Sequence, residues 1–249
     1  MDTNYLVINS TQNKLIKYFN KLKDVAFSKK EKKFLIEGEH LIALASGFLD
    51  YIITKKEYNF SYKDIKTIYV SDEILEKLSS GKSKARIIGV CHYKNEEPTT
   101  SNKLIYLNKV QDPGNVGTIF RTALAFSYFD ILVDEETSFK YNIKTIQASQ
   151  GAIFKENIVK TSFNEIVKFK ENGYKIIATT LSEDSIFLDE FLKLNINRFI
   201  LIFGNEGKGI SKEILDIADY KIKIPIQNID SLNVAISSGI LLYELRKNN

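Results

Sequence analysis

"VQDPGNVGTIFRTALAF", from Val110 to Phe126, places a polar loop directly before an apolar run that contains a single arginine, Arg121. The residues before it, "KLIYLN" at 103–108, form a short apolar run typical of a buried strand. Pro113 and Gly114 break that run, and apolar residues with helical spacing follow. The stretch therefore predicts a strand, a tight loop and a helix.

Two further stretches repeat this order of strand, polar loop and helix. They are "FILIFGNEGKGIS" at 199–211 and "YKIKIPIQNIDSLNVAISS" at 220–238. In open α/β sheets ligands gather at the carboxyl ends of strands, where glycines admit close approach and helix N-termini favour anions. The three loops predict one composite pocket, although glycine and asparagine also serve simply to turn a chain. Neither the GxGxxG fingerprint nor a P-loop is present, so a dinucleotide or ATPase site is not supported.

The polar segment "KNEEPTTSNK" at 94–103 separates two regions of alternating apolar runs and predicts a domain boundary. Before it we expect a small α/β domain with helices at 11–22 and 72–80 and strands at 34–38, 65–71 and 85–93. After it we expect strands at 103–108, 129–134, 156–160, 174–180, 198–204 and 220–225, and a last helix from Ser231 to Lys247. Strands that alternate with helical segments predict a parallel sheet covered on both faces.

The composition limits the chemistry that is available. With 249 residues and 44% hydrophobic content the chain can bury a sizeable core. Its apolar runs are too short to cross a bilayer and its first residues lack the form of a signal peptide, so we expect a cytoplasmic protein. The single cysteine, Cys91, excludes an internal disulfide, and we expect no metal site. His40 and His92 are expected to be structural, the first beside a helix and the second at a strand end.

Positive charge is concentrated in the first part of the chain. The net charge is +4, and residues 1–100 carry all of it. Eight lysines supply most of the excess, offset locally by Asp24 and Glu31. They are Lys14, Lys17, Lys21, Lys23, Lys29, Lys30, Lys32 and Lys33. This asymmetry indicates contact with a polyanion, and the alternative is a solvated helix face.

The three loops, in this order and spacing, resemble the three motifs of SpoU-type (TrmH family) RNA ribose 2′-O-methyltransferases of the SPOUT superfamily. The segment "YNIKTIQASQGAIFKENIV" at 141–159 resembles the family's connecting region, and "STQNKLIKYFNKL" and "FLIEGEHLIALA" resemble its RNA-binding domain. The resemblance implies an RNA substrate-binding domain at 1–95, a linker at 96–102 and a SPOUT methyltransferase domain at 103–249. It also implies a deep trefoil knot and a homodimer that acts on rRNA or tRNA.

The resemblance further implies S-adenosylmethionine as the methyl donor and assigns two sets of residues. The cofactor-binding set is Thr180, Leu181, Gly204, Ile224 and Leu232. The catalytic set is Asn115, Arg121, Glu206, Ser231 and Asn233. Two alternatives stay open: an RNA-binding protein with a catalytically silent SPOUT fold, and a SPOUT enzyme that methylates a base.

Two features depart from the family pattern. Gln147 stands where arginine is common in the family, which points to an altered RNA or subunit contact. The loop "IPIQNIDSLN" at 224–233 lacks the usual glycine and is one residue short, so the adenosyl contacts around 227–230 are expected to differ.

Three of the proposed catalytic residues, Arg121, Glu206 and Ser231, also have a purely structural interpretation. Arg121, six residues after Asn115, is expected to share a helix face with it and to stabilise the reacting oxygen, or else to pair with Asp112 or Glu206. Glu206 is expected to favour the positive sulfonium or to orient Arg121, or else simply to cap a helix. Ser231 could be the N-cap of the last helix. Asn233 is harder to explain by packing, because it falls in an apolar helical run.

Overall fold

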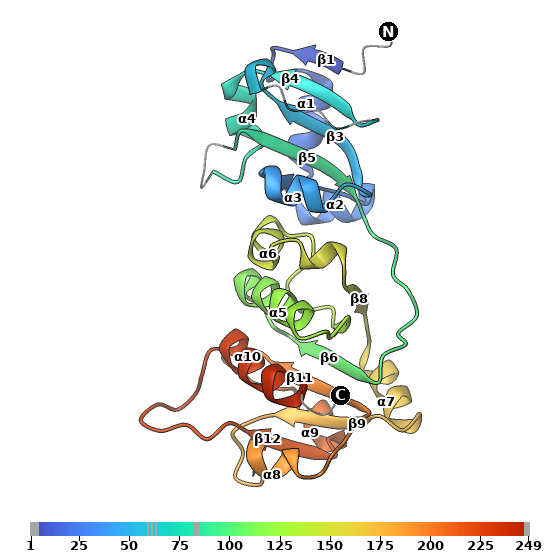
Figure 1. The fold of residues 1–249 in the computed structure, drawn as a ribbon, viewed down its shortest axis with the longest axis vertical. Helices are drawn as coiled ribbons and strands as arrows, with labels where there is room; N and C mark the ends of the chain where they lie inside the picture. The colour runs from blue at the N-terminus through green and yellow to red at the C-terminus, as the bar shows by residue number, and fades with distance from the viewer. Residues whose placement is uncertain (1–4, 59, 61, 63, 82–84, 247–249) are drawn as a thin grey trace. The chain divides into compact units, whose positions relative to one another are not determined.

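The computed structural model describes residues 5–58, 60, 62, 64–81 and 85–246, which form two compact units (Figure 1). The first unit comprises residues 1–95 together with 141–154, and the second comprises 96–140 together with 155–249. The segment 141–154, which falls in the predicted second domain, thus packs within the first unit. Phe34 stacks on Tyr141 with ring centroids 4.3 Å apart, and a Cβ on Gly151 would lie 2.4 Å from Leu44 Cδ1.

The first unit is a five-stranded mixed sheet with helices around it. Its elements are β1 (Tyr5–Ile8), α1 (Lys14–Lys21), α2 (Val25–Glu31), β2 (Lys33–Glu37), α3 (Glu39–Leu44), β3 (Leu49–Thr54), η1 (Lys56–Tyr58), β4 (Lys66–Val70), α4 (Asp72–Leu78), β5 (Ile87–His92), α6 (Ile143–Ser149) and η2 (Ala152–Phe154). The strand order is β1-β4-β3-β5-β2, with β5 antiparallel to both of its neighbours. Strands β1 and β3 were not predicted. His92 ends β5 as predicted, and His40 lies in the first turn of α3.

The second unit is a parallel sheet, as predicted, and it has seven strands where six were expected, because the two-residue β10 was not predicted. Its elements are β6 (Lys103–Asn108), α5 (Pro113–Ala125), β7 (Asp130–Val133), β8 (Asn157–Lys160), α7 (Phe163–Glu171), β9 (Lys175–Thr179), β10 (Ile186–Phe187), α8 (Leu188–Leu192), β11 (Phe199–Gly204), α9 (Lys212–Ile217), β12 (Tyr220–Lys223) and α10 (Val234–Leu245). The strand order is β10-β12-β9-β11-β6-β7-β8. Strand β11 therefore lies between β6 and β9, which both precede it in the chain.

Both faces of the central strand are buried, which explains its continuous apolar sequence. Ile200 and Ile202 of β11 share a core with Ile166 of α7 and Ile214 of α9. The opposite face of β11 contacts α10, which also packs along α5. None of the described helices is long and apolar enough to cross a membrane.

Candidate active site

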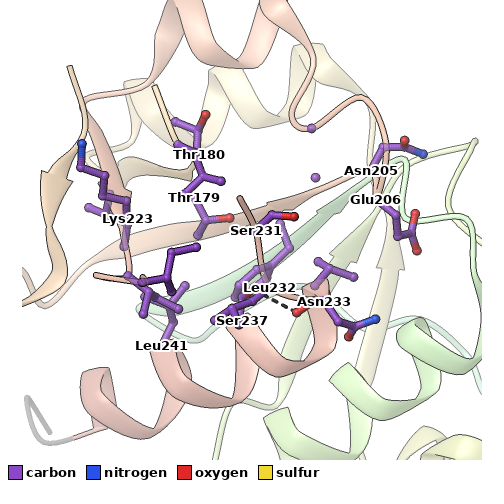
Figure 2. A pocket seen from close by; sticks show the side chains of 18 of the residues that line it. Thr179, Thr180, Asn205, Glu206, Lys223, Ser231, Leu232, Asn233, Ser237 and Leu241 are labelled. Carbon is purple, nitrogen blue, oxygen red and sulfur yellow. Dashed lines mark hydrogen bonds between the residues drawn. The ribbon is translucent and has the colours of Figure 1, made fainter. Parts of the chain in front are cut away.

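Three parallel strands end at one cavity of about 520 Å³ (Figure 2). The loops that follow β9, β11 and β12, together with the start of α10, line this cavity. The carboxyl ends of parallel strands meet at one edge of a sheet, so the predicted loops after β11 and β12 come together here. The predicted loop after β6 does not line the cavity, and the loop after β9 takes its place. All five residues of the predicted cofactor set line the cavity: Thr180, Leu181, Gly204, Ile224 and Leu232. Glu206, Ser231 and Asn233 line it too.

The loop after β11 turns back on its own strand. Asn205 and Gly209 exchange two backbone hydrogen bonds, each 3.0 Å long. A Cβ on Gly204 would lie 2.4 Å from the Gly209 carbonyl carbon and 2.5 Å from Ile210 N. Because both obstacles are backbone atoms, only glycine fits at position 204 without moving the loop.

Asn205 joins this loop to the loop after β6, and the sequence did not single it out. Its Oδ1 accepts hydrogen bonds from the N–H groups of Gly207 (3.0 Å) and Lys208 (2.9 Å). Its Nδ2 donates to the carbonyl of Lys109 at 2.9 Å. Lys109 has φ 63°, a backbone conformation that non-glycine residues rarely adopt. The Asn205 side chain thus satisfies three backbone groups and ties the two loops together.

The Glu206 carboxylate forms a second link between the loop after β11 and the loop after β6. It accepts hydrogen bonds from the N–H groups of Gln111 (3.3 Å) and Asp112 (3.1 Å) and from Nδ2 of Asn115 (3.0 Å). Partial burial acts to raise the pKa of Glu206, but hydrogen bonds from Asn115 and from backbone N–H groups outweigh it and hold the pKa below the ordinary value. Glu206 is therefore an ionised acceptor at neutral pH, and it does not pair with Arg121.

Asn115 and Asn233 connect the first and third loops. The Asn233 Nδ2 donates to Asn115 Oδ1 at 3.0 Å. The Asn233 Oδ1 accepts from the N–H groups of Ala235 and Ile236, so Asn233 is the N-cap of α10. The predicted helix start at Ser231 and the expectation that Ser231 caps it are therefore wrong. Asn233 does not lie inside an apolar helical run, and its amide has partners on both sides.

Arg121 lies apart from this network. Helix α5 begins at Pro113, where the Asp112 side chain caps it by accepting from Asn115 N at 2.8 Å. Six residues make about one and two-thirds turns, so Arg121 lies about 120° around the helix from Asn115. The prediction that both share a face is wrong. Among the described residues, Arg121 is exposed and forms no ion pair, so neither Asp112 nor Glu206 holds it.

The two departures from the family pattern have local explanations. Asn228, in the loop that lacks glycine, has φ 65°, and asparagine tolerates this left-handed conformation better than most side chains. Gln147 donates from Nε2 to Ser80 Oγ at 3.3 Å within the first unit. In the part of the chain that the structure describes, no group of His, Cys, Asp and Glu side chains is arranged to hold a metal ion.

Comparison with known proteins agrees with this geometry. Residues 102–243 match the model of the SpoU rRNA Methylase family. The Bacillus subtilis 23S rRNA (guanosine(2553)-2′-O)-methyltransferase RlmP is 32% identical over 248 residues, covering 96% of this chain and 98% of that protein.

Solved structures with the same fold cover nearly the whole chain. An RNA 2′-O ribose methyltransferase has a TM-score of 0.80 at 25% identity, over 98% of this chain and 99% of that one. The AdoMet-bound rRNA methyltransferase from Sinorhizobium meliloti has a TM-score of 0.84 at 22% identity, over 98% of both chains. At this identity the comparison establishes only that the two proteins share a fold. The resemblance of the three loops is thereby confirmed: the chain belongs to the SpoU rRNA methylase family, within the SPOUT methyltransferases.

Proposed function

We propose that the protein transfers a methyl group from S-adenosylmethionine to a ribose 2′-hydroxyl of structured RNA, either rRNA or tRNA. One observation carries the proposal. The cavity at the ends of β9, β11 and β12 is joined to α5 through the hydrogen-bonded residues Glu206, Asn115 and Asn233. The B. subtilis relative that matches along nearly its whole length is named for this reaction on 23S rRNA.

The residues of the cavity fit S-adenosylmethionine. Its volume is in the range of small-molecule sites. Apolar side chains such as Ile224, Leu232 and Leu241 offer a surface for an adenine ring, and the hydroxyls of Thr180 and Ser237 offer polar contacts. The close approach of the Gly209–Ile210 backbone to Gly204 fixes the shape of the loop that lines the cavity. We assign the cofactor to Thr180, Leu181, Gly204, Ile224 and Leu232.

The chemistry requires positioning and charge stabilisation. The bound cofactor supplies a methyl group on a sulfonium, which is already a good leaving group, whereas a ribose hydroxyl is a weak nucleophile. Arg121 is exposed and has no ion-pair partner among the described carboxylates, so its guanidinium fork is available for an RNA phosphate or for the oxygen that loses its proton. Asn115, Glu206 and Asn233 hold the start of α5 beside the cavity, and Ser231 adds a hydroxyl at its edge.

The two alternative functions have less support. A catalytically silent binding protein would have no need to retain the complete hydrogen-bonded set of Glu206, Asn115 and Asn233. A base-methylating enzyme would differ from the ribose-modifying relative whose sequence matches nearly the whole chain. The remaining assignments follow the same proposal: residues 1–95 bind the RNA substrate, 96–102 link them to the methyltransferase domain at 103–249, and the protein acts in the cytoplasm.

We also propose a homodimer through α10. Ile236, Ile240 and Tyr243 are 57%, 37% and 45% exposed and lie at i, i+4 and i+7, so they form one apolar stripe. Light scattering should give twice the mass of one chain, and Ile240→Glu should reduce it. A wild-type protein with the mass of one chain would refute the dimer.

A trefoil knot in residues 103–249 belongs to the same proposal. It is supported by the membership of the chain in the SpoU rRNA methylase family, and the insertion of β11 between the earlier strands β6 and β9 is compatible with it. An experimental structure whose backbone can be pulled straight from both ends would contradict the knot.

The reaction is tested with the purified chain, labelled S-adenosylmethionine and total RNA from a strain that lacks the gene. We expect label in one 2′-O-methylnucleoside after complete digestion and mass spectrometry. Label in a methylated base would favour the base-methylating alternative, and no transfer to any RNA would favour the silent protein.

A further inference from the structure

The eight lysines near the N-terminus do not share one role. Lys23 donates to the carbonyls of Lys77 and Ser79, both at 2.6 Å, and burial lowers its pKa. Lys33 forms an ion pair with Asp50 at 2.6 Å. These two lysines stabilise the first unit and are not available to a partner.

Helix α1 presents a row of the remaining lysines to solvent. Lys14, Lys17 and Lys21 lie at i, i+3 and i+7 and are exposed, while Ile16 and Phe19 on the opposite side are fully buried. The helix contains no acidic residue, since its sequence is KLIKYFNK. The spacing corresponds to a rise of about 4.5 to 6 Å between neighbouring charges.

Helix α2 extends this row past an aromatic ring. The Lys21 ammonium lies 5.8 Å from the centroid of the Phe27 ring, which in turn packs edge-on against Tyr18. Lys30 follows Phe27 by three residues, so it projects from the same side of α2 and is exposed. We call Lys14, Lys17, Lys21 and Lys30 the α1–α2 lysine surface.

The acids nearest in sequence do not neutralise this surface. Asp24 caps α2 by accepting from Phe27 N at 2.8 Å. Glu31 accepts from the Tyr18 hydroxyl at 3.0 Å, and burial together with this carboxylate raises the pKa of Tyr18 to about 12. Among the described residues, none of the four lysines is within 4.0 Å of a carboxylate. The positive charge is therefore uncompensated at close range.

We propose that the α1–α2 lysine surface docks the phosphate backbone of the RNA substrate. This inference rests on the proposed function, since it names the surface by which the first unit holds the RNA. A membrane surface fits less well, because the apolar side of α1 is packed in the core and neither helix exposes a large apolar side chain. A polyanion complements four unpaired ammonium groups in a row.

The test is the salt dependence of RNA binding by the full chain. Each phosphate contact contributes about 0.7 to 0.9 to the slope of log K against log salt, so four contacts contribute about three. The variant Lys14→Gln/Lys17→Gln/Lys21→Gln/Lys30→Gln should therefore bind deproteinised rRNA with a slope reduced by about three. The matched control Lys56→Gln/Lys66→Gln/Lys168→Gln/Lys193→Gln removes the same charge from other exposed lysines and should change the slope by less than one. Replacement of the four surface lysines by arginine should retain the wild-type slope, because arginine keeps the positive charge.

A slope reduction no larger than that of the control would overturn the proposal. Its failure is distinguishable from failure of the proposed function, because single-turnover methyl transfer at saturating total RNA is measured on the same proteins. If wild type and the glutamine variant methylate equally well and bind with the same slope, only the docking surface is wrong. If wild type transfers no methyl group, the reaction itself is wrong, whatever the slope.

Discussion

Asn233 Nδ2 donates a hydrogen bond to Asn115 Oδ1 at 3.0 Å and joins two loops that lie 118 positions apart in the chain. Because Asn115 also donates to Glu206, all three sequence motifs meet in one hydrogen-bonded row beside the cavity. Each amide in the row uses both its oxygen and its nitrogen. A change at one residue should therefore disturb the geometry of the other two.

Asn115→Asp tests this row. The substitution replaces the amide donor by an oxygen that faces the Glu206 carboxylate, while the acceptor for Asn233 is kept. We expect a loss of about 1 to 3 kcal/mol in unfolding free energy at pH 7, and a lower rate of methyl transfer. Thermal unfolding and single-turnover assays measure the two effects. The control is Asn164→Asp at an exposed position in the first turn of α7, and it should leave both quantities near wild type. If the two variants behave equally, the hydrogen bonds of Asn115 do not contribute to stability or to methyl transfer.

Gly204→Ala tests whether the close packing of the loop after β11 shapes the cofactor cavity. Its Cβ would meet backbone atoms of Gly209 and Ile210 at 2.4 and 2.5 Å, so the loop must move. Overpacking of this kind typically costs about 1 to 3 kcal/mol, and we expect calorimetry to show S-adenosylmethionine affinity lowered about tenfold or more. Gly207→Ala is the control, because its Cβ would have only Asn205 Oδ1 within 4 Å, at 3.7 Å. If both variants bind the cofactor like wild type, position 204 does not set the shape of the pocket.

Asn205 is predicted to be a positioning residue. Asn205→Asp keeps the acceptor for Gly207 and Lys208 but loses the donor to the Lys109 carbonyl. The loop after β11 should keep its shape, while its link to the loop after β6 loosens. We expect kcat to fall about tenfold with little change in S-adenosylmethionine affinity, whereas Asn205→Ala should lower both. Steady-state kinetics with calorimetry separates these outcomes, and an Asp variant with wild-type kcat would show that the link to Lys109 is dispensable.

The lowered pKa of Glu206 predicts a defined pH dependence of stability. A carboxyl group whose pKa is lower in the folded state than in the unfolded state stabilises the protein at pH values above the pKa of the unfolded state, which is 4.5 for Glu206. That contribution is lost as the pH falls through the folded pKa. Wild type should therefore exceed Glu206→Gln in unfolding free energy at pH 7, and the difference should shrink below pH 4.5. Denaturant titrations at several pH values measure it, and a difference that does not depend on pH would show that the carboxylate charge is not what the loop binds.

The sequence predicts the parallel sheet and a cavity at its carboxyl edge because both follow from local patterns, although the loop after β9 lines the cavity in place of the loop after β6. Buried parallel strands are continuously apolar, and their carboxyl ends must meet at one edge. The role of Asn205 could not be predicted in this way, since its partner Lys109 lies 96 residues away in the chain. The packing of Gly151 against Leu44 is equally non-local.

Two errors at the site came from small shifts in register. Placing the N-cap of α10 two residues early made Ser231 the cap in place of Asn233. Counting six residues as two turns put Arg121 on the face of Asn115, although two turns require about seven. The first error arose because helical periodicity does not fix the first residue of a helix, and the second because the number of residues per turn was miscounted.

The central claim is RNA ribose methylation that depends on Arg121, and one comparison tests it most directly. RNA is prepared from wild-type cells, from cells that lack the gene, and from deletion cells that carry either the wild-type gene or the Arg121→Ala gene. Each RNA sample is digested to nucleosides and analysed by mass spectrometry. The exposed position of Arg121 predicts a stable variant that still binds S-adenosylmethionine, with transfer slowed by about two to three orders of magnitude. We expect one 2′-O-methylnucleoside to disappear on deletion, to return with the wild-type gene and to stay absent or scarce with Arg121→Ala. An unchanged set of 2′-O-methylnucleosides in the deletion cells would contradict the account.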